Sequence, residues 1–272
     1  MDKQYNKTEN NLKIIPLGGC EEVGRNMTVF EYNQDIVILD MGLQFPEEDM
    51  PGIDYVIPNT EYLKGKEKNI RAVVLSHGHL DHIGAAPILL KKLGNPQIIG
   101  RPLTIEMVKH RQEDFERNSS KKLKTTYIKD LQQKISLGGF TLKFFQIDHT
   151  IMDAVGVILE TPVATVIHPG DWSIEKDPIG REAIKYTHLA NLKRPTILML
   201  ESLGSTNSKI SVTEEAMLSN LYKLMKQAPG RTIIATFSSQ IQRIRQVLEF
   251  AAQTGRKVVL DGFSMKLNIE IA

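Results

Sequence analysis

The sequence predicts an α/β protein: a layered α/β/β/α sandwich followed by the start of a Rossmann-like domain. In the first part of the chain, runs of short strand patterns are interrupted by only a few helical patterns, which favours layered sheets over a doubly wound sheet. Past residue 195, strand and helix patterns alternate one by one, as in a parallel sheet. The 272 residues suit one large or two ordinary domains. We therefore expect one domain over residues 1–199 and a second over residues 200–272.

The first domain is expected to open with β-hairpins and to continue with strands and two helices. Glycine and asparagine turns divide the early apolar runs. Helical spacing of apolar residues predicts helices at residues 83–93 and 103–117, and Gly94 and Pro96 end the first of them. Strands are predicted at residues 12–17, 27–32, 35–40, 72–75, 123–128, 133–137, 141–147, 154–160 and 163–167.

The carboxyl-terminal part has a different pattern. A helical segment at residues 182–190 precedes it. Apolar runs then alternate with amphipathic helical spacing, in the order strand, helix, strand, helix, strand, which is typical of a parallel sheet of Rossmann-like type. The predicted strands cover residues 196–200, 231–237 and 257–260, and the predicted helices cover residues 212–226 and 240–253.

Composition excludes several classes of protein. The single cysteine, Cys20, rules out an intrachain disulfide and agrees with a reducing compartment. No apolar run reaches the length of a membrane span, and the polar start lacks the apolar stretch of a signal peptide, so we expect no membrane contact and a cytoplasmic location. The formal net charge of +2 is too small to argue for nucleic acid by itself.

Four side chains able to bind a metal follow the predicted strand at residues 72–75. They are His77, His79, Asp81 and His82, all within six residues. In an extended segment His77 and His79 share a face, while a helix that starts near His82 turns Asp81 and His82 to the other side. One short loop would therefore serve two neighbouring metal positions. Imidazole and carboxylate ligands without a thiolate suit zinc, with manganese as an alternative.

Further ligands are expected where other predicted strands end. Two later strands run into His149 and into the pair His168 and Asp171. Asp40 also follows a strand, but a turn-forming role is favoured for it. His110 lies in a predicted helix with no partner ligand at helical spacing, so we expect it to lie at the surface or to be satisfied within the core.

These motifs resemble the metallo-β-lactamase fold family. Within that family, the neighbouring sequence is closer to the nucleic-acid-cutting β-CASP branch, and closest to the ribonuclease J family. The resemblance covers almost the whole chain. The segments that carry it are residues 16–27 (PLGGCEEVGRNM), 39–42 (LDMG), 45–54 (FPEEDMPGID), 56–58 (VIP), 77–82 (HGHLDH), 149–153 (HTIMD) and 168–172 (HPGDW).

The resemblance implies a two-metal site and a reaction. RNA phosphodiester bonds would be hydrolysed by a hydroxide that bridges two zinc ions, with manganese or magnesium as alternatives. Endonuclease and 5′-to-3′ exonuclease action are both implied, on RNA with a 5′-monophosphate, by a homo-oligomer when full length. The aspartates 81 and 171 would be catalytic, and His168 would lie behind the ligands. The implied ligands are His77, His79 and His149 for the first ion, Asp81 and His82 for the second, and Asp171 as the bridge.

The resemblance also assigns roles in the second domain. Glu201 resembles an acidic catalytic residue that faces the metals, and Ser205, Thr206 and Asn207 resemble the polar loop after it. The two serines at 238 and 239 precede a predicted helix. They are interpreted either as phosphate-binding groups or as helix caps, with capping favoured.

The family continues beyond the last motif found here, so we expect this chain to be an amino-terminal fragment, with both domains incomplete. The second ion should then bind more weakly than the first, and exonuclease activity should be low or absent. Two alternatives stay open. One is a small-molecule hydrolase of the same fold, such as a thioesterase or lactamase, and the other is a non-catalytic fragment that binds metal or RNA.

Overall fold

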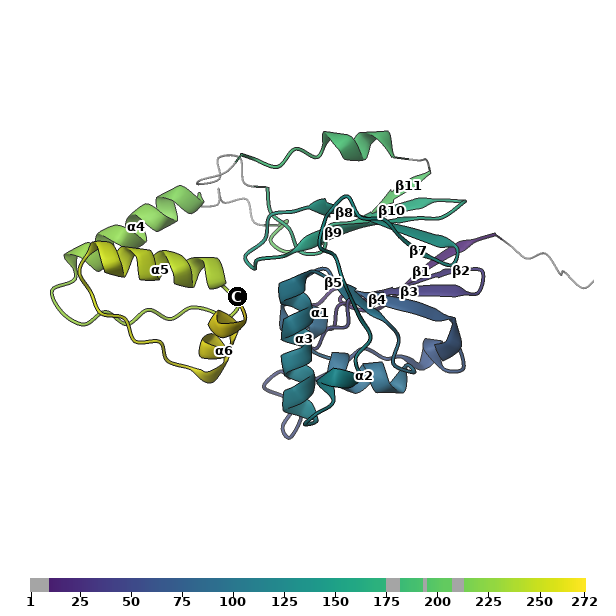
Figure 1. Cartoon of the computed structure of the whole chain (residues 1–272), viewed down its shortest axis with the longest axis horizontal. Helices are drawn as coiled ribbons and strands as arrows, with labels where there is room; N and C mark the ends of the chain where they lie inside the picture. The colour runs from purple at the N-terminus through teal and green to yellow at the C-terminus, as the bar shows by residue number, and fades with distance from the viewer. Residues whose placement is uncertain (1–9, 175–181, 193–194, 207–212) are drawn as a thin grey trace, which may run out of the picture.

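The chain folds around two β-sheets that lie face to face. The computed structural model describes residues 10–174, 182–192, 195–206 and 213–272. The first sheet has the strand order β1-β2-β3-β4-β5-β6 and the second has the order β11-β10-β9-β8-β7 (Figure 1). The strands are β1 (Leu12–Gly18), β2 (Met27–Tyr32), β3 (Asp35–Leu39), β4 (Ile70–Val74), β5 (Ile98–Gly100), β6 (Thr125–Tyr127), β7 (Ile135–Leu137), β8 (Phe140–Gln146), β9 (Val155–Glu160), β10 (Thr165–His168) and β11 (Thr196–Leu198).

Each sheet contains both antiparallel and parallel strand pairs. The first three strands form the expected antiparallel hairpins, and β3, β4, β5 and β6 then run parallel to one another. The second sheet is antiparallel, except that β11 pairs parallel with β10. Because parallel strands end at the same edge, the loops that follow β3 and β4 emerge side by side.

The main core fills the space between the two sheets. Alternate side chains of each strand point inward, so both sheets contribute to one apolar layer. The inward side chains include Phe30, Val37, Val74, Phe140, Leu142, Val157 and Val166, all of which are buried.

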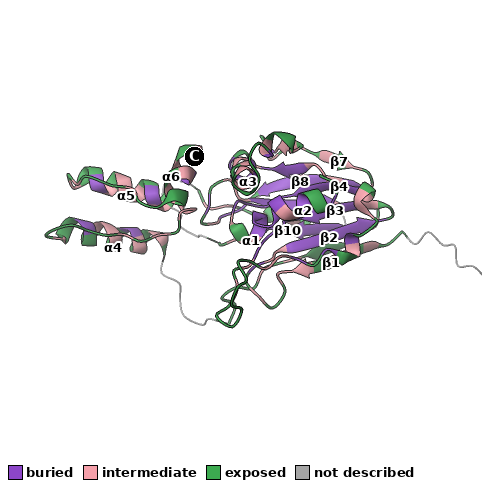
Figure 2. Ribbon diagram, turned by 90° about the horizontal axis from the view of Figure 1, so that it is seen from below, coloured by how far each residue is buried: buried purple, intermediate pink, exposed green. Residues whose placement is uncertain are grey.

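Helices cover the outer face of the first sheet. Helix α2 (Ala86–Lys92) and helix α3 (Pro102–Phe115) pack Leu89, Ile105 and Val108 against this face, beside the short helix α1 (Leu80–Ile83). The layered α/β/β arrangement expected from the sequence is therefore confirmed. The central strands β2, β3 and β4 are almost wholly buried, whereas the edge strands β1 and β7 are partly exposed, as Figure 2 shows.

The outer face of the second sheet is covered by a shorter segment. Tyr186, Leu189 and Leu192 pack there against Phe145 and its buried neighbours. The helix predicted at residues 182–190 is wrong, because the helical element found there is shorter and begins later. Only the 3-10 element η4 (Thr187–Asn191) is helical, and such short turns are common where a chain connects larger elements.

The carboxyl-terminal part consists of three helices beside the sandwich. These are α4 (Glu214–Gln227), α5 (Ile241–Gln253) and α6 (Phe263–Ile271) (Figure 1). Both long helices begin and end within two residues of the predicted positions. An apolar contact joins this part to the sandwich through Leu103, Ile151 and Ile241.

Two strands predicted for the carboxyl-terminal part are wrong. Residues 231–237 and 257–260 are extended but form no ladder among the described residues. Strands of a parallel sheet need helices on both faces, whereas Ile233 and Val259 are each 89% exposed. The strand predicted at residues 196–200 does form, as β11, but it pairs with β10 in the sandwich. The domain boundary at residue 200 stays a prediction.

A buried carboxylate ties the first sheet to the loop before β4. Glu31 on β2 accepts hydrogen bonds from Lys13 Nζ at 3.0 Å, Lys66 Nζ at 2.7 Å and the Tyr62 hydroxyl at 3.0 Å. Burial raises the pKa of Glu31, but the bonds from Lys66, Lys13 and Tyr62 outweigh it and hold the pKa below 4.5. The charged form of Glu31 is thus stabilised by folding.

We predict that Glu31→Gln lowers the free energy of unfolding by about 1–3 kcal/mol at neutral pH, because charge-assisted hydrogen bonds are lost. The folded-state pKa of Glu31 lies below the unfolded value, so its stabilisation is present above pH 4.5 and is lost as the pH falls through the folded pKa. Urea unfolding at neutral pH and at acid pH measures both effects. Glu61→Gln, at an exposed ion pair with Lys64, is the control. A difference that stays constant down to acid pH would contradict this account.

Candidate metal centre

The loop after β4 holds four candidate ligands in a tight turn. The chain leaves the sheet through Leu75 and Ser76, both buried, and reaches His77, which is also fully buried. A side chain at position 78 would come within 2.6 Å of Met107 Sδ, so glycine is needed for the turn to pass α3. Helix α1 then begins at Leu80 and ends at Ile83, directly before Gly84.

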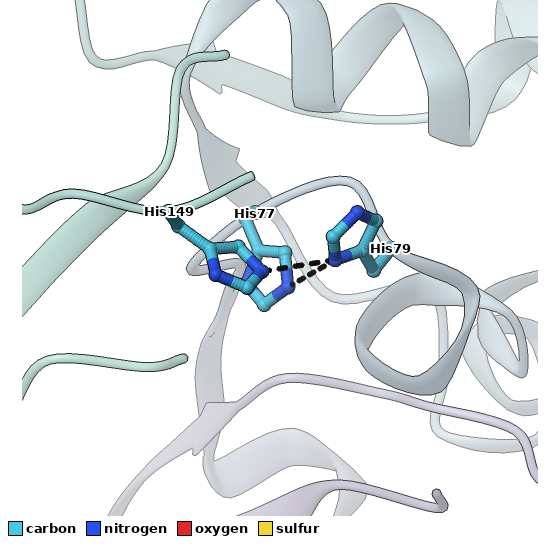
Figure 3. A group of neighbouring side chains, drawn as sticks. All are labelled: His77, His79 and His149. Carbon is cyan, nitrogen blue, oxygen red and sulfur yellow. Dashed lines mark hydrogen bonds between the residues drawn. The ribbon is translucent and has the colours of Figure 1, made fainter. Parts of the chain in front are cut away.

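Three imidazoles converge from two separate loops (Figure 3). His79 Nδ1 lies 3.1 Å from His77 Nε2 and 3.0 Å from His149 Nε2. His149 comes from the loop after β8 in the second sheet. Nitrogens that bind one zinc ion at 2.0–2.1 Å in a tetrahedron lie about 3.3 Å apart. The three ring nitrogens therefore have the spacing of ligands around one small cation.

A second group lies directly beside the first. His82 Nε2 is 3.2 Å from Asp171 Oδ1 and 3.5 Å from Asp81 Oδ2. The other oxygen of Asp171 lies 3.9 Å from His149 Nε2, so this carboxylate stands between the two groups. Candidate ligand atoms of His77, His82 and Asp171 all lie within 4.8 Å of one another.

The two groups differ in protonation. Burial lowers the pKa of His77 well below 6.5, and it lowers the pKa of His149 to about 4. Burial lowers the pKa of His79 as well. These rings are neutral at pH 7 and present lone pairs, as metal ligation requires. Each neutral ring keeps one N–H, and His79 Nδ1 lies within hydrogen-bond distance of both His77 Nε2 and His149 Nε2. With the lone pairs of the three rings turned toward one another, the same donor set fits a bound cation.

The ring of His82 is in the opposite state. Burial lowers its pKa, but the charge of Asp40 and hydrogen bonds with Asp171, Asp40 and Asp81 outweigh burial and hold the pKa well above 6.5. Burial raises the pKa of both Asp81 and Asp171, yet the bond from His82 brings each below its ordinary value. A proton on His82 thus occupies the place where a second cation would fit.

Asp40 belongs to the site, although the sequence favoured a turn-forming role for it over that of a metal-side carboxylate. Its carboxylate lies 2.7 Å from His82 Nδ1 and accepts hydrogen bonds of 2.8 Å from the Ser76 amide and hydroxyl. Asp40 also has a φ of 60°, so it makes a turn as expected and orients His82 at the same time. The signal that was available is its place at the end of β3, next to the end of β4.

The glycine and asparagine motifs hold helix α1 in place. Gly42 has no side chain because a Cβ there would lie 1.6 Å from the carbonyl oxygen of Asp81. The amide of Asn26 donates to that same carbonyl at 3.1 Å. Asn26 Nδ2 lies 3.1 Å from His82 Nε2 and 3.4 Å from Asp81 Oδ2. The loop before β2, which carries Asn26, and the loop after β3, which carries Gly42, therefore fix the ligands of the second group.

Comparison with known families identifies the fold. Residues 21–198 match the family model for the Metallo-beta-lactamase superfamily. The chain belongs to this superfamily. Residues 229–272 match a second model, Ribonuclease J, beta-CASP domain. The superfamily implies a metal cofactor, and the two His/Asp groups of the site provide residues able to hold it.

Curated relatives confirm the resemblance to the ribonuclease J family. Ribonuclease J of Thermus thermophilus is 37% identical over 270 residues, which cover 94% of this chain and 46% of the relative. Ribonuclease J of Helicobacter pylori (strain J99) is 34% identical over 267 residues, which cover 96% of this chain and 38% of the relative. The chain thus spans less than half the length of these relatives.

A solved structure shares the fold. A protein of unknown function from Enterococcus faecalis V583 superposes with a TM-score of 0.66 at 18% identity, covering 95% of this chain and 67% of that one. At this identity the likeness concerns the fold alone. Within the described ranges of the chain, no helix is long and apolar enough to cross a membrane.

The candidate metal ligands open onto a cavity of about 710 Å³. His79, Asp81 and Asp171 line one side of it, and residues 237–240 and helix α6 line the other. A smaller cavity of about 290 Å³ lies on the far side of His149, with Arg243 in its wall. The candidate ligands are therefore accessible between the sandwich and the carboxyl-terminal helices.

The structure brings together all six residues suggested as metal ligands. Ser238 and Ser239 line the larger cavity with them. Neither serine caps helix α5, which begins after Gln240 without a side-chain cap, so the favoured capping role is wrong. His110 lines the cavity wall. His168 Nδ1 accepts a hydrogen bond from the Gly170 amide and so shapes the turn before Asp171.

The structure does not bring Glu201 to the metal ligands. Its carboxylate accepts a hydrogen bond from the Leu203 amide at 2.6 Å, within its own turn, and it lines neither cavity. The catalytic role expected for Glu201 stays a prediction. Ser205 and Thr206 lie in the exposed turn that follows, and Asn207 lies outside the described residues.

We predict that Asp40→Asn weakens the ion held by His82 by about 10- to 100-fold, because partners that orient a ligand tune its affinity to this extent. The ion held by His77, His79 and His149 should keep its affinity, since none of these rings contacts Asp40. Calorimetric titration with zinc measures both affinities. Asp130→Asn, in an exposed turn after β6 where the carboxylate accepts a bond from the Gln132 amide, is the matched control. Two unchanged affinities in Asp40→Asn would contradict the orienting role.

We also predict that the two ions differ in proton release. At pH 7 the first three imidazoles are neutral, so binding there releases almost no protons, whereas His82 must lose its proton before it can bind a cation. The second affinity should therefore rise with pH until His82 is neutral. Titrations in buffers of different ionisation enthalpy count the protons. Equal proton release at both sites would show that this assignment of charge is wrong.

Proposed function

We propose that this chain is a zinc-dependent nuclease that hydrolyses RNA phosphodiester bonds, like the relatives named Ribonuclease J. The observation that carries the proposal is the position of Asp171 between two ligand groups, at the mouth of a cavity whose other wall matches a Ribonuclease J β-CASP domain. Two adjacent cation sites are typical of enzymes that displace a group at phosphorus.

In this proposal the imidazoles of His77, His79 and His149 hold one ion, and His82 and Asp81 hold the other. Asp171 bridges them. When bound, the ions lower the pKa of water and neutralise charge on the phosphoryl oxygens. Nitrogen-rich ligands favour zinc, with manganese or magnesium as alternatives for the more carboxylate-rich group.

The chain's own residues position the substrate and manage protons. Asp81 and Asp171 are ionised and lie on the cavity side, and Asp81 Oδ1, the oxygen that does not face His82, can orient an attacking water. The hydroxyls of Ser238 and Ser239 line the opposite wall and can donate to a phosphate. Asp40 keeps His82 in its orientation through Nδ1. No catalytic role is given to Glu201.

The finer parts of the proposal follow the ribonuclease J family. They are cleavage both within the RNA and from its 5′ end, a preference for a 5′-monophosphate, a homo-oligomer, a cytoplasmic location and a domain boundary near residue 200. The single cysteine supports the cytoplasmic location. The end of β11 at Leu198 supports the domain boundary near residue 200. A small-molecule hydrolase of this fold is not favoured by any feature of the cavity.

We predict that the zinc-loaded chain cleaves a labelled single-stranded RNA and bis(p-nitrophenyl) phosphate. His77→Ala and Asp81→Asn should each lower both rates at least about a hundredfold, because each removes several kcal/mol of transition-state stabilisation. His188→Ala, an exposed histidine away from both cavities, should keep both rates. Cleavage of nitrocefin or a thioester but not of RNA would replace the proposal with the small-molecule alternative. A metal-loaded chain that cleaves no phosphodiester would refute it.

A further inference from the structure

The loop at residues 149–154 carries the third imidazole into the site. It is fixed at both ends by backbone bonds. Before the loop, the Ser173 amide donates to the Asp148 carbonyl at 2.8 Å, and after it the Val155 amide donates to the Ser76 carbonyl at 2.9 Å. Between these ends the backbone forms a turn but no helix or strand. Side chains must therefore hold the loop, and with it the imidazole.

Asp153 lies in this turn and bonds to the start of α3. Its Oδ1 accepts a hydrogen bond from Arg101 Nη2 at 3.0 Å, and its Oδ2 accepts one from the Leu103 amide at 3.0 Å. This amide is one of the unpaired donors at the amino end of a helix, and the N-cap residue, Arg101, makes no side-chain cap. A carboxylate at this end is also favoured by the helix dipole. Both oxygens of Asp153 are used in this way, so it supports the site without being a metal ligand.

Arg101 joins the same contact to the first sheet. Its Nη1 donates to the carbonyl of Ile128 at 2.9 Å and to that of Lys129 at 3.3 Å, just after β6, while Nη2 reaches Asp153. The side chains of Arg101 and Asp153 are only 24% and 22% exposed, so water screens their attraction less than it does at the surface. A planar guanidinium with several bonds has little freedom left. The ion pair therefore ties the loop to a rigid part of the sandwich.

The backbone at Asp153 indicates that its carboxylate matters. Asp153 has a φ of 65°, in the left-handed region where glycine is the usual residue and a side chain adds strain. Glycine would make the turn without that strain. The bonds to Arg101 and to the Leu103 amide offset the strain and account for the aspartate.

Helix α3 also supports the other loop of the first group. A Cβ on Gly78 would lie 2.6 Å from Met107 Sδ on α3 and 3.4 Å from Ile151 Cδ1. Ile151 is buried in the apolar cluster that Met107 also joins, so the two loops and the helix contact one another. His82 of the second group is instead oriented by Asp40. The two groups of ligands thus rest on different contacts.

We infer that Asp153 is a positioning residue for the first ion, the one proposed to lie among the three imidazoles. Its bonds to Arg101 and to α3 hold the loop in the place where His149 Nε2 lies 3.0 Å from His79 Nδ1. Within the described part of the chain His149 Nδ1 makes no hydrogen bond, so the orientation of the ring depends on the loop. The inference rests on the proposed function only in that both use this ion.

Asp153→Gly tests the inference, because glycine relaxes the turn and removes both bonds of the carboxylate. Calorimetric titration with zinc should show the first affinity reduced about 10- to 100-fold, as for other residues that orient a ligand, and the second unchanged. Asp153→Asn keeps an acceptor for the Leu103 amide but loses the ion pair, so it should restore part of the first affinity. Asn33→Gly makes the same backbone change in the exposed turn between β2 and β3, where φ is 55°, and should alter neither affinity.

Two further measurements separate positioning from a general role in folding. In EDTA, with no ion bound, the amides of residues 149–154 should exchange hydrogen faster in Asp153→Gly than in the wild type, whereas those of α1 should be unchanged. Arg101→Gln should weaken the first ion as Asp153→Asn does. The double variant should lose less affinity than the sum of the two, because both substitutions remove the same ion pair.

Several outcomes would overturn the inference and leave the proposed function intact. They are a first affinity that is unchanged in Asp153→Gly, two affinities that fall together with the temperature of unfolding, and a loop whose exchange is unaffected. Selective loss of the first affinity in Asp153→Gly, with a zinc-loaded wild-type chain that cleaves no phosphodiester, would support the inference and refute the proposed function. A wild-type chain that binds no zinc at the three imidazoles would refute both.

Discussion

The metal centre depends on one buried carboxylate, that of Asp40. It joins the end of β3 to the loop after β4 by bonds to the amide and hydroxyl of Ser76, and it joins that loop to α1 by its bond to His82. A buried charge is stable only when it is fully bonded, so this arrangement fixes all three elements together. The orientation of His82 follows from it.

The stacking of the two sheets supplies the remaining ligands. His149 and Asp171 follow strands of the second sheet, and the apolar layer between the sheets sets how close they come to His77. The bond from the Val155 amide to the Ser76 carbonyl at 2.9 Å links the sheets at the same edge. The site is therefore a product of the whole sandwich rather than of the local motif, and its opening toward α5 and α6 places a cavity where a polymer substrate can reach it.

The sequence was informative wherever local rules decide the outcome. Strand ends followed by His77 or His149 predicted the convergence of ligands, and amphipathic spacing predicted α4 and α5 closely. The sequence was less informative where contacts between residues far apart in the chain decide the structure. Apolar residues such as Ile233 predict a strand, but without a covered neighbour on each face no ladder forms. The role of Asp40 depends on a contact with His82, 42 residues away, which no periodic pattern records. The bond from the Leu203 amide to the Glu201 carboxylate is likewise a contact that no periodic pattern records.

The central claim is that side chains from three separate loops hold two cations beside one cavity. The most direct measurement is anomalous scattering at the zinc edge from crystals of the chain grown with zinc. The account predicts one peak among the ring nitrogens of His77, His79 and His149 and a second between His82 and Asp81, with the Asp171 carboxylate contacting both. Zinc found only at other surface residues, with these six side chains unligated, would contradict it.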